Sequence, residues 1–536
     1  MIRLALASFA FASFLTASAG AAHIDLENAV SPIHAELNID AKLGGTPMVG
    51  SSNHLVITVT DSAGAPVKNA NVKAVLTMSS MDMGSMAPRV TSNGDGTYTA
   101  DLNLTMAGGW KVAITVEAPN QPMAVKTIEF NAVDMSGSME MSMPGRLGNW
   151  GMEKESSGTS WQPAASPMFM KHLPASGKYQ LHLMGQATLN YSDAGGKRGD
   201  NKIYSNSMVM LMAHRNTGGG ILGLNLMLSL DPIFNGEFGY PNLFQTGETA
   251  HGQKLTDFQH PHDLIAELAG SYSHPIGGGL NAFLYGGPAG EPALGGPTFM
   301  HRASGMEIPE APITHHWFDS THISYGVVTA GINSERWQLE GSVFNGHEPD
   351  ENRYGIDPLR LDSSSARITF NPNKNLSLNA SYGYLNSPES TEPGVNQRRT
   401  TASIQWSRDL SHTDNLSAAL AFGRNAIEGK NFDAWLAEAT LLQDKSSWFF
   451  RWENVAKNEL GGVPAGNYRV NKFLFGGVHR LAEREGLDFG LGAYAGLYSF
   501  PSSLNAFYGR NPVTAGVFLR VRPNRMQMEM NPSIAK

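Results

Sequence analysis

The segment Tyr179-Gln-Leu-His-Leu-Met-Gly-Gln-Ala-Thr-Leu-Asn-Tyr191 indicates how most of this chain folds. Apolar or small residues alternate with more polar ones along it, and a tyrosine stands at each end. A strand in a soluble protein is usually about half as long. The length, the alternation and the aromatic ends are typical of a strand that crosses a membrane with one side facing lipid.

Similar alternation recurs along the rest of the chain, at residues 337–343, 376–384, 402–407, 416–422, 448–452 and 487–497. Short turns alternate with long loops, which are expected at 231–262, 287–321, 345–362, 387–398, 456–467 and 500–510. This pattern is the signature of an outer-membrane barrel, and the spacing gives about sixteen strands. We therefore predict an all-β chain with a large antiparallel transmembrane β-barrel over residues 176–523. A soluble double sandwich is the alternative.

Both ends of the chain bear on its location. Arg3, the apolar run 4–15 and the small residues up to Ala22 form a secretory signal, predicted over residues 1–21. No later apolar stretch is long enough for a transmembrane helix. The tail 524–536 departs from the barrel pattern, because the chain does not end on an aromatic residue. With its short turns facing the periplasm, the barrel is expected in the outer membrane of a Gram-negative bacterium.

The composition limits the partners of the protein. Its 536 residues include 25 methionines and no cysteine, and the formal net charge is −8 without a basic block. Nucleic acid is therefore not an expected partner. The absence of cysteine suits an oxidising compartment and leaves thioethers as the only sulfur ligands. The barrel itself is expected to be surrounded by outer-membrane lipid.

A first domain is predicted over residues 34–132. Short alternating runs occur at 54–59, 72–76, 97–104, 110–116 and 124–130, with turn signals at 61–64 and 93–96. Several short strands at this spacing favour an Ig-like β-sandwich. Residues 133–175, rich in glycine and serine, are predicted to be a flexible connector to the barrel.

Methionines gather at two places in this first part of the chain. One cluster lies between two predicted strands of the sandwich and the other lies in the connector; they comprise Met78, Met81, Met83 and Met86, then Met135, Met139, Met141 and Met143. Thioether sulfur is soft and favours Cu(I). Methionine is also an adaptable filler of irregular cores. Small and polar neighbours argue against burial of the first cluster, so we predict Cu(I) ligands.

Motifs in the first domain and in the barrel each resemble a known protein family. The segments Gly94-Asp-Gly-Thr-Tyr-Thr-Ala100 and Met106-Ala-Gly-Gly-Trp-Lys-Val112 resemble YtkA-like and FixH-like periplasmic Ig-like domains. That resemblance implies a metal-handling or accessory module, with the methionines of the first cluster as candidate ligands. Residues 290–326, with the pattern GEPALG…FMHR…PEAPI…HHW…DSTH, resemble an uncharacterised family of bacterial outer-membrane β-barrels.

Histidines concentrate in the two longest loops and their flanks. The candidate metal ligands are His260, His262, His301, His315, His316 and His322. Imidazoles bind Cu(II) or Zn(II), and nearby carboxylates can orient them. The spacing matches no defined zinc motif, and a polar network in an inward-folded loop explains the same residues. Asp319, Ser320 and His322 are also types used in acyl transfer, although closeness along one chain does not create that geometry.

Together these patterns predict an outer-membrane copper-handling protein without enzymatic activity. The periplasmic Met-loop domain would capture Cu(I), and the barrel would sequester or export it, giving metal tolerance. Periplasmic copper-handling or efflux proteins are the expected partners. The first alternative is a porin-like or structural barrel whose Ig-like module docks a periplasmic partner. The second is a lipid-modifying barrel enzyme.

Overall fold

In a computed structural model of the protein, the structure is described for residues 37–526 with short gaps. The gaps are 45–46, 48, 50–52, 79–84, 105–107, 120, 133–144, 149 and 177. The chain divides into two compact units near residue 143. The predicted signal segment lies outside the described residues, as do Met81, Met83, Met135, Met139, Met141 and Met143.

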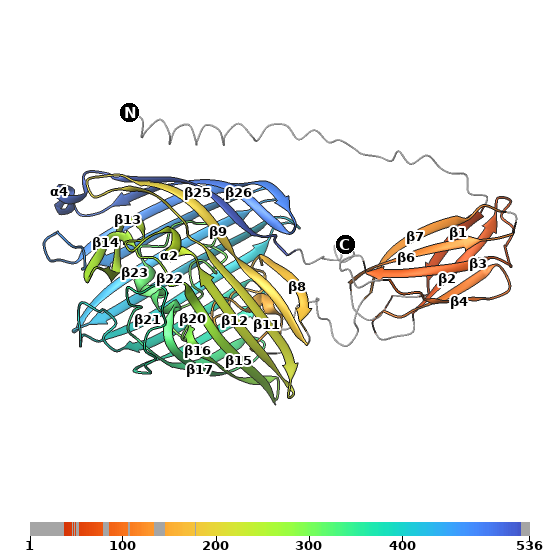
Figure 1. Ribbon diagram of the computed structural model, residues 1–536, viewed down its shortest axis with the longest axis horizontal. Helices are drawn as coiled ribbons and strands as arrows, with labels where there is room; N and C mark the ends of the chain where they lie inside the picture. The colour runs from red at the N-terminus through yellow and green to blue at the C-terminus, as the bar shows by residue number, and fades with distance from the viewer. Residues whose placement is uncertain are drawn as a thin grey trace. The chain divides into compact units, whose positions relative to one another are not determined.

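The first unit is a sandwich of two antiparallel sheets, drawn in red and orange in Figure 1. One sheet has the order β1-β2-β5-β4 and the other β3-β6-β7. The strands are β1 (Leu37–Leu43), β2 (Asn53–Asp61), β3 (Asn71–Met78), β4 (Arg89–Ser92), β5 (Thr97–Leu102), β6 (Gly108–Glu117) and β7 (Ala124–Ala132). Inward residues of both sheets, such as Ile57 and Ile114, form one buried cluster, as facing sheets require.

Met78 lies in the core of this sandwich, not on a loop. Strand β3 alternates between exposed and buried residues as far as Met78, whose side chain is 6% exposed and pairs across the sheet with Trp110. Met86 pairs with Leu76 and packs partly against the same core. The predicted loop placement was wrong for Met78, because the strand continues to this residue and carries its sulfur inward.

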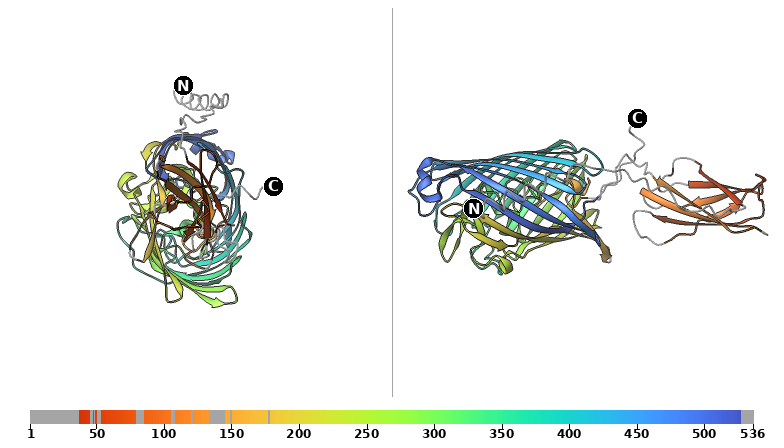
Figure 2. Two further views of the ribbon diagram at one scale, coloured as in Figure 1. Left: turned by 90° about the vertical axis from the view of Figure 1, so that its right-hand side faces the viewer. Right: turned by 90° about the horizontal axis from the view of Figure 1, so that it is seen from above.

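The second unit is a closed antiparallel barrel of 16 tilted strands (Figure 1, Figure 2). They are β9 (Tyr179–Ala194), β11 (Met208–Thr217), β12 (Gly220–Ser229), β15 (Ile265–Gly277), β16 (Leu280–Gly290), β17 (Ser324–Asn333), β18 (Trp337–Phe344), β19 (Ser363–Asn373), β20 (Leu376–Leu385), β21 (Gln397–Asp409), β22 (Asn415–Ile427), β23 (Lys430–Leu442), β24 (Ser446–Lys457), β25 (Tyr468–Arg484), β26 (Leu487–Ser499) and β27 (Val513–Pro523). Strand β9 closes the ring by pairing with β27.

Three shorter features complete the barrel unit. Strand β8 (Met170–Ser176) pairs with the first half of β9, on the edge where β27 pairs with the second half. Strand β10 (Asn201–Tyr204) pairs with the second half of β9, on the edge where β11 pairs with the first half. The connection from β12 to β15 contains a hairpin of β13 (Tyr240–Ala250) and β14 (Gln253–Gln259). Short turns join the strands at one rim and long connections lie at the other, except for the tight turn between β22 and β23.

The outer face of the barrel is apolar and its inner face is polar. In β22, Leu420 is exposed on the outside, whereas Ser417 and Asn425 are buried inside. Trp435 of β23 and Phe450 of β24 are likewise exposed. A closed ring leaves no unpaired strand edge, and an apolar outer face suits hydrocarbon. The predicted all-β class and outer-membrane location are confirmed.

Among the residues that the structure describes, no helix is long and apolar enough to cross a membrane.

The lipid-facing position of Leu420 can be tested by inserting a charge. Leu420 lies near the middle of β22, so Leu420→Arg is expected to destabilise the barrel by about 2–4 kcal/mol. Leu416→Arg, on the same face but beside the short turn, is the matched control and should cost about 0–1 kcal/mol. Urea unfolding of the two variants in lipid vesicles provides the measurement. Equal costs at the two sites would contradict the assigned orientation.

Residues 145–169 lie inside the barrel, so the flexible connector predicted over 133–175 is wrong for this part. Thr159 donates a hydrogen bond to Glu340, and Gln162 accepts one through its carbonyl from Asn371 at 2.8 Å. Asn333 donates to the carbonyl of Leu147 at 3.0 Å. The glycines and serines of this segment form compact turns. These turns are held in place because side chains on distant strands hydrogen-bond to the backbone of the segment.

Candidate metal centre

Five buried histidines gather inside the barrel, on the long connections that follow β14 and β16. They are His260, His262, His315, His316 and His322, and none is more than 7% exposed. They form two groups of three, in each of which the ligand atoms lie within 4.8 Å of one another. One group is His260–His315–His316 and the other is His262–His315–His322. His315 therefore belongs to both.

Each of the five imidazoles is held through its Nδ1 atom. The partners are the Pro261 carbonyl for His260 (3.3 Å, with the Glu248 carboxylate at 3.1 Å), Asp231 for His262 (2.8 Å), Asp319 for His315 (2.7 Å), Glu348 for His316 (2.9 Å) and the Asp319 carbonyl for His322 (2.8 Å). Such acceptors place the proton on Nδ1 and leave the lone pair on Nε2. Within the described part of the chain, no Nε2 atom of the five has a hydrogen-bond partner.

This arrangement matches the way in which proteins prepare histidines to bind metals. A metal-binding histidine donates its other ring nitrogen to a carboxylate or carbonyl, which fixes the tautomer and the direction of the free nitrogen. Buried polar atoms are otherwise almost always hydrogen-bonded. The unpartnered Nε2 atoms, arranged in two overlapping groups of three, therefore form a donor set suited to a metal ion.

Burial keeps three of these rings neutral. Burial lowers the pKa of His315 to about 4, and it lowers the pKa values of His260 and His322 well below the usual value. Burial also opposes protonation of His262, but its hydrogen bond to Asp231 and the charge of that carboxylate raise its pKa overall. Neutral imidazole is the form that binds a metal ion.

The inner segment 291–323 is anchored to the opposite strands of the barrel. Arg302 donates to Glu438 of β23 at 2.8 Å and to Asp319 at 3.3 Å. The backbone of Thr314 donates to Glu453 of β24 at 2.9 Å. These contacts hold the short helix α3 (His315–Phe318), and with it two of the five imidazoles, at a fixed place in the barrel interior.

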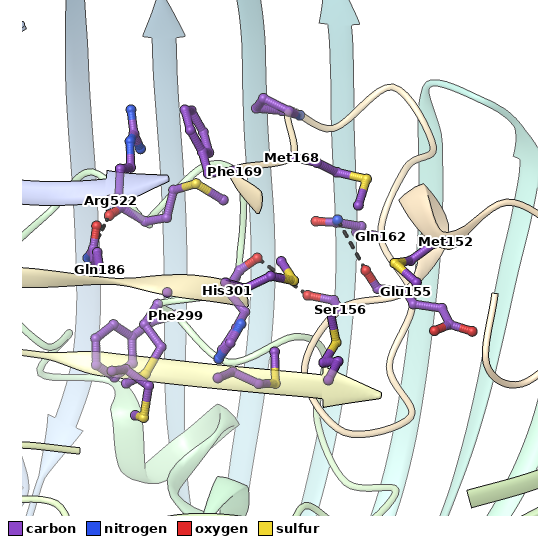
Figure 3. Close-up of a pocket in the computed structure, with 18 of the residues that line it drawn as sticks. Met152, Glu155, Ser156, Gln162, Met168, Phe169, Gln186, Phe299, His301 and Arg522 are labelled. Atoms are coloured by element: carbon purple, nitrogen blue, oxygen red, sulfur yellow. Dashed lines mark hydrogen bonds between the residues drawn. The ribbon is translucent and has the colours of Figure 1, made fainter. Parts of the chain in front are cut away.

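The structure brings together five of the six histidines that the sequence singled out. The sixth, His301, lines a separate cavity among methionines (Figure 3). Asp231, Glu248 and Glu348 were not identified from the sequence, because they lie on connections far from the rings that they hold. The roles of the undescribed methionines as Cu(I) ligands stay predictions.

The acyl-transfer alternative is not supported by the placement of its three residues. Ser320 accepts a hydrogen bond from Arg399 at 2.9 Å, and the Asp319 carboxylate holds His315. His322 Nδ1 is hydrogen-bonded to the carbonyl of Asp319, and its Nε2 atom has no partner among the described residues. A nucleophile and a base in hydrogen-bond contact are therefore not formed by this trio.

Comparisons with known proteins describe the two units separately. A family model described as YtkA-like matches residues 34–115, which confirms the resemblance predicted for the sandwich. No curated protein matches the sequence.

Solved structures similar to the barrel are outer-membrane proteins. OmpT of Vibrio cholerae is 8% identical with a TM-score of 0.39, covering 65% of this chain and 99% of that one. The anion-selective porin from Comamonas acidovorans is 12% identical with a TM-score of 0.39, covering 64% and 99%. OmpF of Salmonella typhi, in complex with daunomycin, is 10% identical with a TM-score of 0.41, covering 66% and 100%. At these identities the likeness concerns the fold alone.

Proposed function

We propose that this protein is an outer-membrane copper-handling barrel that binds copper at the five-histidine centre. The observation that carries this proposal is the set of five buried Nε2 atoms, each oriented through Nδ1 and none partnered within the described chain. A purely structural polar network would use these nitrogens as acceptors. Leaving a buried polar atom unsatisfied costs about 1–3 kcal/mol, so five of them favour a shared ligand.

The chemistry of the available donors favours copper over other metals. Imidazole suits zinc, copper, iron and nickel, whereas thioether sulfur selects Cu(I). The chain contains 25 methionines and no cysteine. Copper is the metal that both donor types bind, in its two common oxidation states. Zinc is the closest competitor for the histidine centre taken alone.

The filled interior of the barrel supports retention of a bound ion. Residues 145–169 and 291–323 both occupy the lumen, and buried ion pairs such as Arg367–Glu340 lie between them and the strands. Free diffusion of small solutes needs an open channel through that space. A filled lumen fits sequestration of a bound copper ion, or its passage after release from the histidine centre, better than free diffusion.

The experiment that tests the proposal is metal titration of the full-length protein in detergent micelles. Cu(II) and Zn(II) are each titrated in competition with a chromogenic chelator. Saturable copper binding, preserved in the surface control His274→Ala, is the expected result. Binding too weak to compete with the chelator, combined with porin-like conductance in planar bilayers, would favour the porin-like alternative that the fold comparisons fit.

The carboxylates that accept hydrogen bonds from the imidazoles should contribute to copper affinity almost as much as the rings themselves. Asp231→Leu removes the acceptor of His262 Nδ1 and is expected to lower copper affinity by about 10–100-fold. Asp444→Leu, at an exposed ion pair with Arg480, is the matched control. Competition titration of both variants gives the comparison. An unchanged affinity in Asp231→Leu would show that this carboxylate does not orient a ligand.

A further inference from the structure

The methionines of the barrel unit gather in a single place. Between residues 145 and 526 there are eleven, all of which belong to one buried cluster or line the cavity beside it: Met152, Met168, Met170, Met184, Met208, Met210, Met212, Met227, Met300, Met306 and Met526. The strands from β15 to β27 carry none. Methionines used only as filler would be scattered among the strands, so this clustering needs another explanation.

The register of the strands aligns four of these methionines in one row. Met170, Met184, Met210 and Met227 are direct cross-strand neighbours on β8, β9, β11 and β12. Directly opposed residues on one face have Cβ atoms about 4.5–5.5 Å apart, so flexible thioethers in such a row can reach a common ion. All four face the interior, because they alternate with outward residues such as Leu211.

The next row towards the short-turn rim contains histidines. His172, His182 and Met212 are cross-strand neighbours on β8, β9 and β11. The Nδ1 atoms of His172 and His182 lie 3.0 Å apart, and the ring of His182 stacks on that of His214 at 4.9 Å. Within the described chain, the Nε2 atom of His182 and both ring nitrogens of His214 have no hydrogen-bond partner.

A cavity of about 80 Å³ lies against these rows. Eight of the methionines line it, and the sulfur atoms of several point into the same space as His301 (Figure 3). His301 is half-buried, and its buried Nε2 atom has no partner among the described residues. The two arginines of the lining, Arg146 and Arg522, are paired with Glu155 and Glu307, so they do not leave an uncompensated positive charge.

We propose that this methionine cavity is a Cu(I) site, separate from the histidine centre. Several thioethers and one neutral imidazole form a soft donor set, which selects Cu(I) over zinc and over hard cations. The proposal rests on the proposed copper function and adds a second site to it, with a stated oxidation state. It needs no redox step, because the ion enters and leaves as Cu(I).

The cavity and the histidine centre are neighbours. Phe299 lines the cavity, and its ring packs edge-on against His315 at 5.5 Å and lies 6.4 Å from His262. His172, His182 and His214 lie on the side of the methionine row that faces the short-turn rim, close to the turn before β9. An ion in the cavity therefore lies between the periplasmic rim and the histidine centre.

The test is anaerobic Cu(I) titration of the full-length protein against a Cu(I) chelator, followed by X-ray absorption. Wild type is compared with the triple variant Met184→Leu/Met210→Leu/Met212→Leu, which conserves volume and removes three sulfurs. Met123→Leu, at an exposed position of the sandwich, is the control. Heat-modifiable gel mobility reports whether each variant retains its folded barrel.

The triple variant is expected to lose one equivalent of tightly bound Cu(I), together with the share of the sulfur scattering that this equivalent contributes. Its Cu(II) binding should remain, because the histidine centre is intact. Unchanged Cu(I) binding and sulfur scattering in a folded triple variant would overturn the inference, while Cu(II) binding would leave the proposed function standing. Conversely, Cu(I) loss in the triple variant without any Cu(II) binding by wild type would support the cavity and refute the histidine centre.

Discussion

Replacing His315 by alanine is expected to reduce the affinity of the barrel for Cu(II) by more than any other single substitution. His315 belongs to both groups of three imidazoles, so its loss leaves neither group complete. Loss of a partner that only orients a metal ligand costs about 10–100-fold in affinity, and loss of the ligand itself should exceed that. Competition titration of the full-length protein measures the change.

Two controls make the His315→Ala result specific. His274→Ala removes an exposed imidazole near the short turn between β15 and β16 and should leave affinity unchanged. His301→Ala removes a half-buried imidazole from the methionine cavity and should leave Cu(II) binding intact. Equal losses in His315→Ala and His301→Ala would indicate a general disturbance of the interior. Wild-type affinity in His315→Ala would contradict the assigned centre.

Glu438→Gln is expected to destabilise the barrel strongly and to weaken metal binding as a consequence. Glu438 accepts hydrogen bonds from Arg302 and Arg451, each at 2.8 Å, and all three side chains are buried. Removing the carboxylate leaves two buried guanidinium groups without this counter-charge. Breaking a buried ion pair in this way costs about 3–5 kcal/mol.

Metal binding should weaken in Glu438→Gln because Arg302 also contacts a residue of the histidine centre. Its guanidinium also binds Asp319, which orients His315, so a displaced Arg302 should disturb the histidine centre. Urea unfolding in vesicles and copper titration are measured on the same preparation. Asp444→Asn, at an exposed ion pair, should change the free energy of unfolding by less than about 1 kcal/mol. Glu438→Gln with wild-type stability would contradict the anchoring role.

The barrel was predictable from sequence because the membrane constrains both faces of a strand. Lipid requires apolar residues at every second position, as around Leu420, and closure of the ring satisfies the strand edges. The sandwich was predictable for the same reason, since its two sheets bury alternating residues. Met78 was misplaced because its predicted strand ended at residue 76, two residues short of the true end.

The histidines of the centre could be found from sequence, but their arrangement could not. His262 is adjacent to Asp263 along the chain, yet the carboxylate that holds it is that of Asp231. Such pairings depend on how long connections fold inside the barrel, which local periodicity does not encode. The buried segment 145–169 was missed for the same reason, because its partners Asn333 and Asn371 lie on distant strands.

The five imidazoles form two overlapping groups of three, and we propose that this centre binds copper. Electron paramagnetic resonance of the full-length protein, loaded with Cu(II) and washed of excess metal, measures that binding. We expect a bound Cu(II) signal with hyperfine structure from several imidazole nitrogens, which His315→Ala weakens and His274→Ala leaves unchanged. A washed protein without bound Cu(II), or a signal without nitrogen coupling, would contradict it.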